Sequence, residues 1–141
     1  GVVVYRFGGP LFFANARTFR DQVLKLAHAD PAPTWIVIAA EPISDVDTTA
    51  ADMLEDLDEA LNARGISLAF AEMSEDVQAT IARYELTRTI NPEHFYPTLN
   101  AALRGYAAAT DAPQAAPPVD DADEAAAHHR RPRTEDPPAD R

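Results

Sequence analysis

Hydroxyl and carboxylate side chains gather in one short stretch, Ser44 to Asp52, which reads SDVDTTAAD. The stretch follows an apolar run and precedes a helical pattern, so it lies at the carboxyl end of a predicted strand, where α/β sheets place most ligand sites. The start of the next helix offers unpaired N–H groups and a partial positive charge that suit a phosphate. Thr48 and Thr49 also carry hydroxyls that can be modified. The candidate chemistry is therefore phosphate binding or modification of a hydroxyl.

The same spacing also has a structural explanation. Thr49 followed by Asp52 matches the [ST]-x-x-[DE] capping pattern, which begins a helix without any further function. Asp45, Asp47 and Asp52 would repel an anion, so a nucleotide is expected to bind here weakly, through its base or through a bridging Mg²⁺. Capping is the favoured explanation from spacing alone, and a ligand site stays open beside it.

Catalysis finds little support among the residues. All four histidines, at positions 28, 94, 128 and 129, lie outside this stretch, so no base stands beside a nucleophile there. The five glycines form neither a phosphate-binding P-loop nor a dinucleotide loop. The absence of cysteine excludes thiolate catalysis and the strong zinc motifs. We predict no catalytic residue, no metal site and no enzyme activity.

The charge of the chain narrows the classes of partner. The formal net charge of −11 argues against DNA and RNA, since nucleic-acid affinity comes largely from Lys and Arg. It would also repel an anionic membrane surface. No apolar run approaches the roughly 20 residues that span a bilayer. We expect a soluble polypeptide, and the opening GVVVYRF, without a signal peptide or initiator Met, is what an excised domain would show.

The elements that must position these side chains alternate between strand and helix patterns. Val2–Tyr5 and Leu11–Phe13 are predicted as short strands joined in a hairpin by the turn signal at 8–10. Asn15 is predicted to cap a helix, which is followed by the βαβ unit that contains the Ser44 to Asp52 stretch. The apolar face of the first helix is formed by Ala16, Phe19, Val23 and Ala27.

The strands of the βαβ unit, Thr34–Ala40 and Ile66–Ala71, lack polar alternation, as central parallel strands do. Ser74 is predicted to cap the next helix, and an extended piece at His94–Tyr96 precedes the last one. The apolar faces of these three helices comprise Ala50, Met53, Leu54, Leu57 and Leu61, then Val77, Ile81 and Tyr84, then Leu99, Ala102, Leu103 and Tyr106. The chain is therefore predicted to be α/β with a single mixed sheet.

Composition changes sharply near position 110. Residues 111–141 hold six of the twelve prolines, and their eight acidic and four basic residues give a charge of −4. This Pro/Asp/Ala-rich segment contains no Leu, Ile or aromatic residue, so it is predicted to be a disordered acidic tail. Residues 1–110 then form one domain with a charge of −7.

Three segments resemble one family. YRFGGPLFFANARTFRDQV (Tyr5–Val23), VDTTAADML (Val46–Leu54) and HFYPTLNAAL (His94–Leu103) are similar to signatures of the STAS domain at the cytoplasmic C-terminus of SulP-type sulphate permeases, and more distantly of anti-sigma factor antagonists. The resemblance implies a single mixed sheet of four to five strands with about four helices mainly on one side. It also implies a membrane-embedded anion transporter N-terminal to Gly1.

The function that the resemblance implies is that of a non-enzymatic regulatory domain at the cytoplasmic face of the plasma membrane. Its expected partners are the transmembrane domain of the same chain and other cytoplasmic proteins. The family-specific residues concentrate between Tyr5 and Phe19, so a contact surface is expected there, made of Tyr5, Phe12, Phe13, Asn15 and Phe19. The alternative is a free-standing antagonist-like switch that binds a partner kinase.

The resemblance also implies a ligand and a modification. Some members of the family bind GTP or GDP near the loop after the central strand, and antagonists are phosphorylated at the hydroxyl that corresponds to Thr48. This chain has Thr where antagonists usually have Ser, and Ala50 where they have Gly. The expected nucleotide-contacting residues, drawn from the ends of both central strands, are Ser44, Asp45, Asp47, Thr48, Thr49, Glu72, Met73 and Ser74.

Overall fold

The two apolar runs predicted as central strands form the middle of one parallel sheet. In the computed structural model, which describes residues 1–84 and 89–110, the strand order is β1 (Val2–Arg6), β2 (Trp35–Ala39), β3 (Ser67–Ala71) and β4 (Phe95–Tyr96). All three pairings are parallel, and β2 is buried at all five positions. The predicted acidic tail, residues 111–141, lies outside the described residues.

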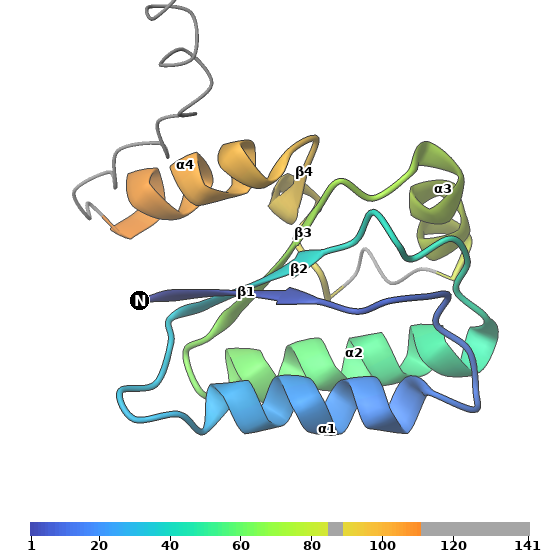
Figure 1. Ribbon diagram of the computed structural model, residues 1–141, viewed down its shortest axis with the longest axis horizontal. Coiled ribbons are helices and arrows are strands. Elements are labelled where there is room, and N and C mark those ends of the chain that lie inside the picture. Colours follow the sequence, from blue (N-terminus) through green and yellow to red (C-terminus); the bar gives the residue numbers. More distant parts are fainter. Residues whose placement is uncertain (85–88, 111–141) are drawn as a thin grey trace, which may run out of the picture.

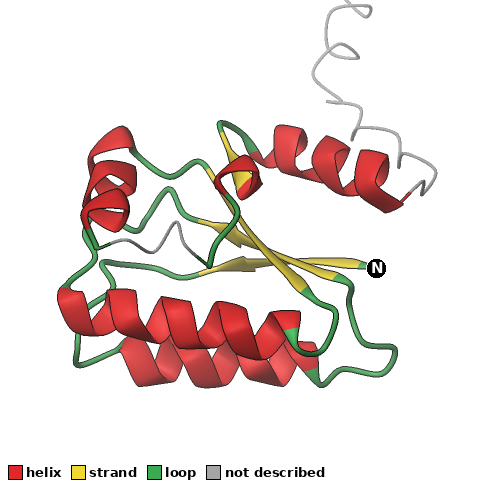
Figure 2. Cartoon of the chain, turned by 180° about the vertical axis from the view of Figure 1, so that it is seen from behind, coloured by secondary structure: helices red, strands yellow, loops and turns green. Residues whose placement is uncertain are grey.

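The helices cover the sheet unequally, which gives three layers (Figure 1). Helices α1 (Ala16–Ala27) and α2 (Thr48–Asn62) lie side by side on one face, and α4 (Leu99–Thr110) lies on the other, as the view from behind also shows (Figure 2). Helix α3 (Glu75–Arg83) follows β3, and a 3-10 turn, η2 (Pro92–His94), precedes β4. The predicted α/β class, with a single sheet and four helices mainly on one side, is confirmed. The sheet is parallel and not mixed as predicted, because no antiparallel hairpin strand joins β1.

The predicted hairpin at the N-terminus is wrong. Leu11 makes an isolated parallel bridge to Val46 instead of a second strand beside β1. Its N–H donates to the Asp45 carbonyl oxygen at 2.9 Å, and its own carbonyl oxygen accepts from the Asp47 N–H at 3.1 Å. The segment after β1 therefore crosses to the β2–α2 loop, where the Leu11 side chain is buried in the core.

Apolar side chains form one cluster on each face of the sheet. The larger cluster packs the sheet against α1, α2 and α3 and contains Phe19 and Phe70 among its largest members. The smaller one, under α4, centres on Trp35, whose ring lies 4.9 Å from that of His94 and 6.0 Å from that of Tyr106 between centroids. Both faces of the central strands are thus dry, which explains why they lack polar alternation.

The helical periodicity predicted the buried faces of α1 and α2 correctly. All four residues named for α1 and all five named for α2 are buried. Tyr84, predicted to join the apolar face of α3, is instead 39% exposed, because α3 ends at Arg83, one residue before it. Gly65, with a φ of +72° in the left-handed region, follows the end of α2.

The helix caps match the predictions at only one of three places. Ser74 caps α3 as predicted, since its hydroxyl accepts from the Val77 N–H at 3.3 Å. Asp47 rather than Thr49 caps α2, because its carboxylate accepts from the Ala50 N–H. Asn15 occupies the N-cap position of α1, but its side chain makes no capping bond there.

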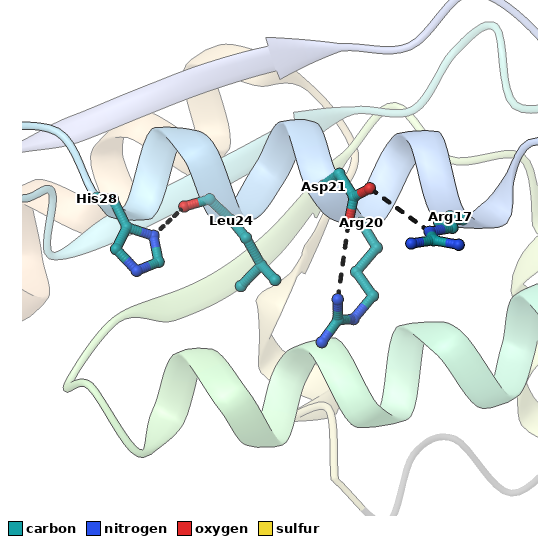
Figure 3. A network of polar contacts seen from close by, with 5 residues as sticks. All are labelled: Arg17, Arg20, Asp21, Leu24 and His28. Atoms are coloured by element: carbon teal, nitrogen blue, oxygen red, sulfur yellow. Dashed lines mark hydrogen bonds and ion pairs between the residues drawn. The ribbon is translucent and has the colours of Figure 1, made fainter.

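Polar contacts on the outer side of α1 stabilise the helix surface (Figure 3). Asp21 lies 3.8 Å from the Arg17 guanidinium and 3.7 Å from that of Arg20, and these exposed ion pairs contribute little each. His28 Nδ1 donates to the Leu24 carbonyl oxygen at 2.6 Å, which leaves Nε2 to accept from Arg64 at 2.6 Å. The ends of α1 and α2 are thereby tied together. Within residues 1–84 and 89–110, no helix has both the length and the apolar character to cross a bilayer.

Candidate functional site

The two predicted loops meet at one edge of the sheet. Ala39 and Ala71, the last residues of β2 and β3, are register partners, and the Ala40 N–H donates to the Ala71 carbonyl oxygen at 2.8 Å. The β2–α2 loop and the β3–α3 loop therefore leave the sheet together, as parallel neighbouring strands require. Six of the eight side chains predicted to contact a nucleotide are exposed there: Ser44, Asp45, Thr48, Thr49, Glu72 and Ser74.

The other two of the eight predicted side chains are not exposed at this edge. Met73 is buried in the larger apolar cluster, so its side chain cannot contact a ligand at the surface. The Asp47 side chain is half-buried and both of its oxygens accept hydrogen bonds. The accessible part of the candidate site is therefore smaller than the sequence predicts.

Asp47 joins two segments that are far apart in the chain. One carboxylate oxygen, Oδ1, accepts from the Ala50 N–H at 2.8 Å and caps α2. The other, Oδ2, accepts from the Phe13 N–H at 2.8 Å. Charged acceptors make the stronger class of hydrogen bond, so this carboxylate fixes the start of α2 against the segment that precedes α1.

The local electrostatics are acidic. Asp45 Oδ1 accepts from the Val46 N–H at 2.8 Å, and Glu72 begins the β3–α3 loop with a φ of +62°, a left-handed backbone conformation that non-glycine residues rarely adopt. Arg6, at the end of β1, is ion-paired with Glu41 at 2.8 Å, and both side chains are well exposed. A phosphate at this edge therefore meets carboxylates and a cation that already has a partner.

A second candidate surface lies beside the β2–α2 loop. Phe12 is 39% and Phe13 is 73% exposed, and their rings pack edge to face with centroids 5.9 Å apart. Neighbouring side chains in a strand point to opposite faces of the sheet. This segment is not a strand, and the two neighbouring rings contact each other. The sequence predicted that both rings belong to a contact surface, but it could not show that Asp47 holds the segment.

Three other residues were predicted to belong to the contact surface, and all three are less exposed than Phe12 and Phe13. Phe19 is completely buried, with its ring edge-on to those of Tyr5 and Phe7, so its assignment to a contact surface is wrong. Tyr5 is half-buried against the same core, and its hydroxyl bonds to Gln22. Asn15 braces the segment from within, as its side chain accepts from the Phe12 N–H at 3.0 Å.

Asp58 is a buried ionisable residue that the sequence analysis did not identify. It is 3% exposed, and no other charged side chain among the described residues is buried. Burial raises the pKa of its carboxyl from 3.8 to about 6, although a hydrogen bond from Asn62 at 2.9 Å and the nearby His94 act to lower it. Its position four residues after Leu54 on the apolar face of α2 was the available signal. It lies three turns of helix away from Asp47 and takes no part in the loop edge.

A cavity of about 330 Å³ opens between α3 and the segment before β4. The described residues that line it are mostly apolar and include no titratable group: Gln78, Ala79, Ile81, Ala82, Pro92 and Phe95. Neither a nucleophile nor a base is therefore available on these walls, and the cavity gives no support to catalysis.

Comparison with known proteins agrees with this architecture. Residues 1–102 match the STAS domain family. A probable sulfate transporter of Mycobacterium tuberculosis is 37% identical over 107 residues, which are 75% of this chain and 19% of that protein. The chain thus spans about a fifth of the length of this relative.

Solved structures share the fold. The STAS domain of a SulP transporter from Vibrio cholerae superimposes with a TM-score of 0.66 at 21% identity, over 79% of this chain and 85% of that one. A putative anti-sigma factor antagonist from Thermotoga maritima gives 0.62 at 18% identity, over 74% and 86%. The chain belongs to the STAS domain family, as the three quoted segments indicated.

Proposed function

We propose that this STAS domain is the non-enzymatic regulatory domain of an inorganic-anion transporter, with sulphate as the first candidate, at the cytoplasmic face of the plasma membrane. The domain acts by contact with the transmembrane part of its own chain. The relative from M. tuberculosis supports this proposal, because this chain resembles about a fifth of a probable sulfate transporter. The observation that carries it is the exposed Phe12–Phe13 pair.

The Phe12–Phe13 pair has the properties of a binding hot spot. Large aromatic side chains dominate the energetics of protein interfaces, and a pair held in place before binding loses less entropy on docking. The hydrogen bonds that the Phe12 and Phe13 N–H groups donate to Asn15 and Asp47 supply that order here. Exposing both rings to water has no stabilising role in the isolated domain.

Charge favours a protein surface over the bilayer as the occupant. Residues 1–110 carry a formal charge of −7, and the exposed Asp45 lies in the loop that bonds to Leu11, next to the ring segment. Anionic lipids repel such a domain, whereas the cytoplasmic loops of membrane proteins are enriched in Lys and Arg. The rings with their acidic surroundings are therefore suited to a basic cytoplasmic loop that carries an apolar contact.

The test is anion uptake by the full-length gene product in proteoliposomes. Phe13→Asp and Phe12→Asp each place a charge in the pair, and we expect a several-fold change in uptake of labelled sulphate. Tyr84→Asp is the matched control, because Tyr84 is as exposed as Phe12 but lies at the end of α3, outside the ring segment. Unchanged uptake in both Phe variants, with the domain still folded by circular dichroism, would refute the docking role.

Weak binding of GTP or GDP at the loop edge is the second part of the proposal. The convergence of the two loops at the ends of neighbouring strands supports it, as does the strained backbone of Glu72, since such strain gathers at functional sites. The side chains available are Ser44, Asp45, Thr48, Thr49, Glu72 and Ser74. Titration of the ¹⁵N-labelled chain with GDP to millimolar concentration should shift amides of residues 44–49 and 72–74. If none of them moves, this site does not bind the nucleotide.

An antagonist-like phosphoswitch is the alternative function. Thr48 is exposed at the first position of α2, where the helix dipole favours a phosphate, and the T. maritima antagonist has the same fold. Intact-mass spectrometry of the chain purified from its host should then show a +80 Da species that Thr48→Ala abolishes. A gene that continues upstream into many apolar spans, with no such species, would favour the transporter domain.

A further inference from the structure

We infer that Asp47 is a positioning residue that couples the start of α2 to the Phe12–Phe13 pair, so that the state of the β2–α2 loop sets how the rings are displayed. The inference rests on the proposed docking role of the rings and adds the device that controls them. It needs no ligand to be identified, because the coupling is built into the hydrogen bonds of one carboxylate.

Three hydrogen bonds connect the two segments, and one of them involves a side chain. Asp47 Oδ2 accepts from the Phe13 N–H at 2.8 Å, across 34 positions of sequence. The two backbone bonds that Leu11 makes to Asp45 and Asp47 align the segments immediately before this point. Figure 1 shows the chain after β1 passing beside the start of α2, as these bonds require.

The two phenyl residues are held by different anchors. Phe12 is fixed within its own segment, because Asn15 accepts from its N–H at 3.0 Å and its carbonyl oxygen accepts from the Ala16 N–H at 2.9 Å. Asn15 also donates to the Pro10 carbonyl oxygen at 2.8 Å. Phe13, the more exposed of the two, is tied through its N–H to Asp47, which belongs to the β2–α2 loop.

The loop therefore has a direct means of releasing Phe13. A second anion at the start of α2, whether bound or attached to the neighbouring Thr48 hydroxyl, would compete for the Ala50 N–H and repel the Asp47 carboxylate. Either effect lengthens or breaks the bond to Phe13, since both bonds come from the same carboxylate. The ring pair then loses the order that makes it a good docking surface.

Two substitutions of Asp47 separate its hydrogen bond to Ala50, which caps α2, from its hydrogen bond to Phe13. Asn and Ser are N-cap residues as effective as Asp, so Asp47→Asn and Asp47→Ser keep the bond from Ala50. Asn has only one acceptor oxygen and presents an NH₂ group on its other side, and Ser is too short to reach both donors. Asp47→Ala removes both bonds. Asp45→Asn is the matched control, because it deletes the same charge two positions away, and the Asp45 carboxylate accepts from the neighbouring Val46 N–H and not from Phe13 or Ala50.

The experiment is amide hydrogen exchange by NMR on the 141-residue chain. Asp47→Asn and Asp47→Ser should speed exchange of the Phe13 amide about ten-fold or more, as loss of a charged hydrogen bond predicts, and leave Ala50 within about two-fold. Nuclear Overhauser contacts between the two rings should weaken in parallel. Asp45→Asn should change neither residue. An unaltered Phe13 amide in both Asp47 variants would overturn the inference.

A second measurement, sulphate uptake, tests whether the order of the ring pair affects docking. In the full-length transporter, Asp47→Asn should change sulphate uptake in the same direction as Phe13→Asp. Asp56→Asn, which deletes an equal charge on the exposed side of α2, should leave uptake unchanged. If Phe13→Asp has no effect while the Phe13 amide still responds to Asp47→Asn, the docking proposal fails and the coupling stands. If Phe13→Asp changes uptake but neither Asp47 variant changes the exchange rate of the Phe13 amide, the coupling fails and the docking proposal stands.

Discussion

Asp58 makes the stability of this domain depend on pH in the direction opposite to most carboxylates. Burial on α2 raises the pKa of its carboxyl from 3.8 to about 6, so folding favours the protonated form. The contribution is fully present below the unfolded pKa, near 4, and is lost as pH rises through about 6. At neutral pH, the native state therefore pays for an ionised group in an apolar layer.

The size of this cost follows from the shift. Each pKa unit corresponds to about 1.4 kcal/mol, so the ionised carboxylate costs about 3 kcal/mol at pH 7.5 and less than about 1 kcal/mol at pH 4, as upper bounds. Asp58→Asn removes the titration while its amide oxygen can still accept from Asn62. We expect the variant to be more stable than the parent chain at pH 7.5 and nearly equal to it at pH 4.

Urea denaturation at the two pH values measures this effect. The chain has a single tryptophan, Trp35, which is the first residue of β2 and is buried under α4, so its fluorescence reports unfolding directly. Asp56→Asn is the control, because Asp56 lies on the exposed side of the same helix and its removal deletes an equal charge. A stability difference between Asp58→Asn and the parent that is the same at pH 4 and pH 7.5 would refute the reasoning.

Two further predictions concern packing. A Cβ on Gly105 would lie 2.3 Å from the Tyr96 hydroxyl oxygen and 2.6 Å from Cζ, so Gly105→Ala should destabilise the domain by about 1–3 kcal/mol, despite the better helix propensity of Ala. The loss should shrink when Tyr96→Ala is added, and a loss that persists would contradict the contact. Phe19→Ala should cost about 3–5 kcal/mol in urea unfolding because Phe19 is fully buried, whereas Phe13→Ala should stay within about 0.5 kcal/mol. Equal losses at the two positions would mean that their assignment to core and surface is wrong.

The elements that rest on local periodicity were predictable. The faces of α1 and α2 follow from apolar residues that recur every three or four positions, because neighbouring turns of one helix bring them together regardless of the rest of the chain. The meeting of the Ser44 and Ser74 loops also followed from the sequence. It needs only that β2 and β3 are parallel neighbours, which strands joined by a short crossover usually are.

The turn at Gly8–Gly9–Pro10 was only half predictable. Its residue types show that the chain bends there, but they carry no information about where it goes next. The expected hairpin partner was β1, yet Leu11 pairs with Val46 and is buried in the core. Which segment pairs with which depends on the apolar surface that each pairing buries, and this surface belongs to the whole domain.

The sequence by itself determined the family, through the segments that begin at Tyr5, Val46 and His94, and it determined which helical faces are apolar. Only the tertiary structure decided that Asp47 is the cap of α2 and the anchor of Phe13, that Leu11 pairs with Val46, and that Asp58 is buried. The physical reason is distance along the chain. Spacing within one element reports local geometry, whereas a hydrogen bond across 34 residues and the burial of a side chain depend on how separate elements come together.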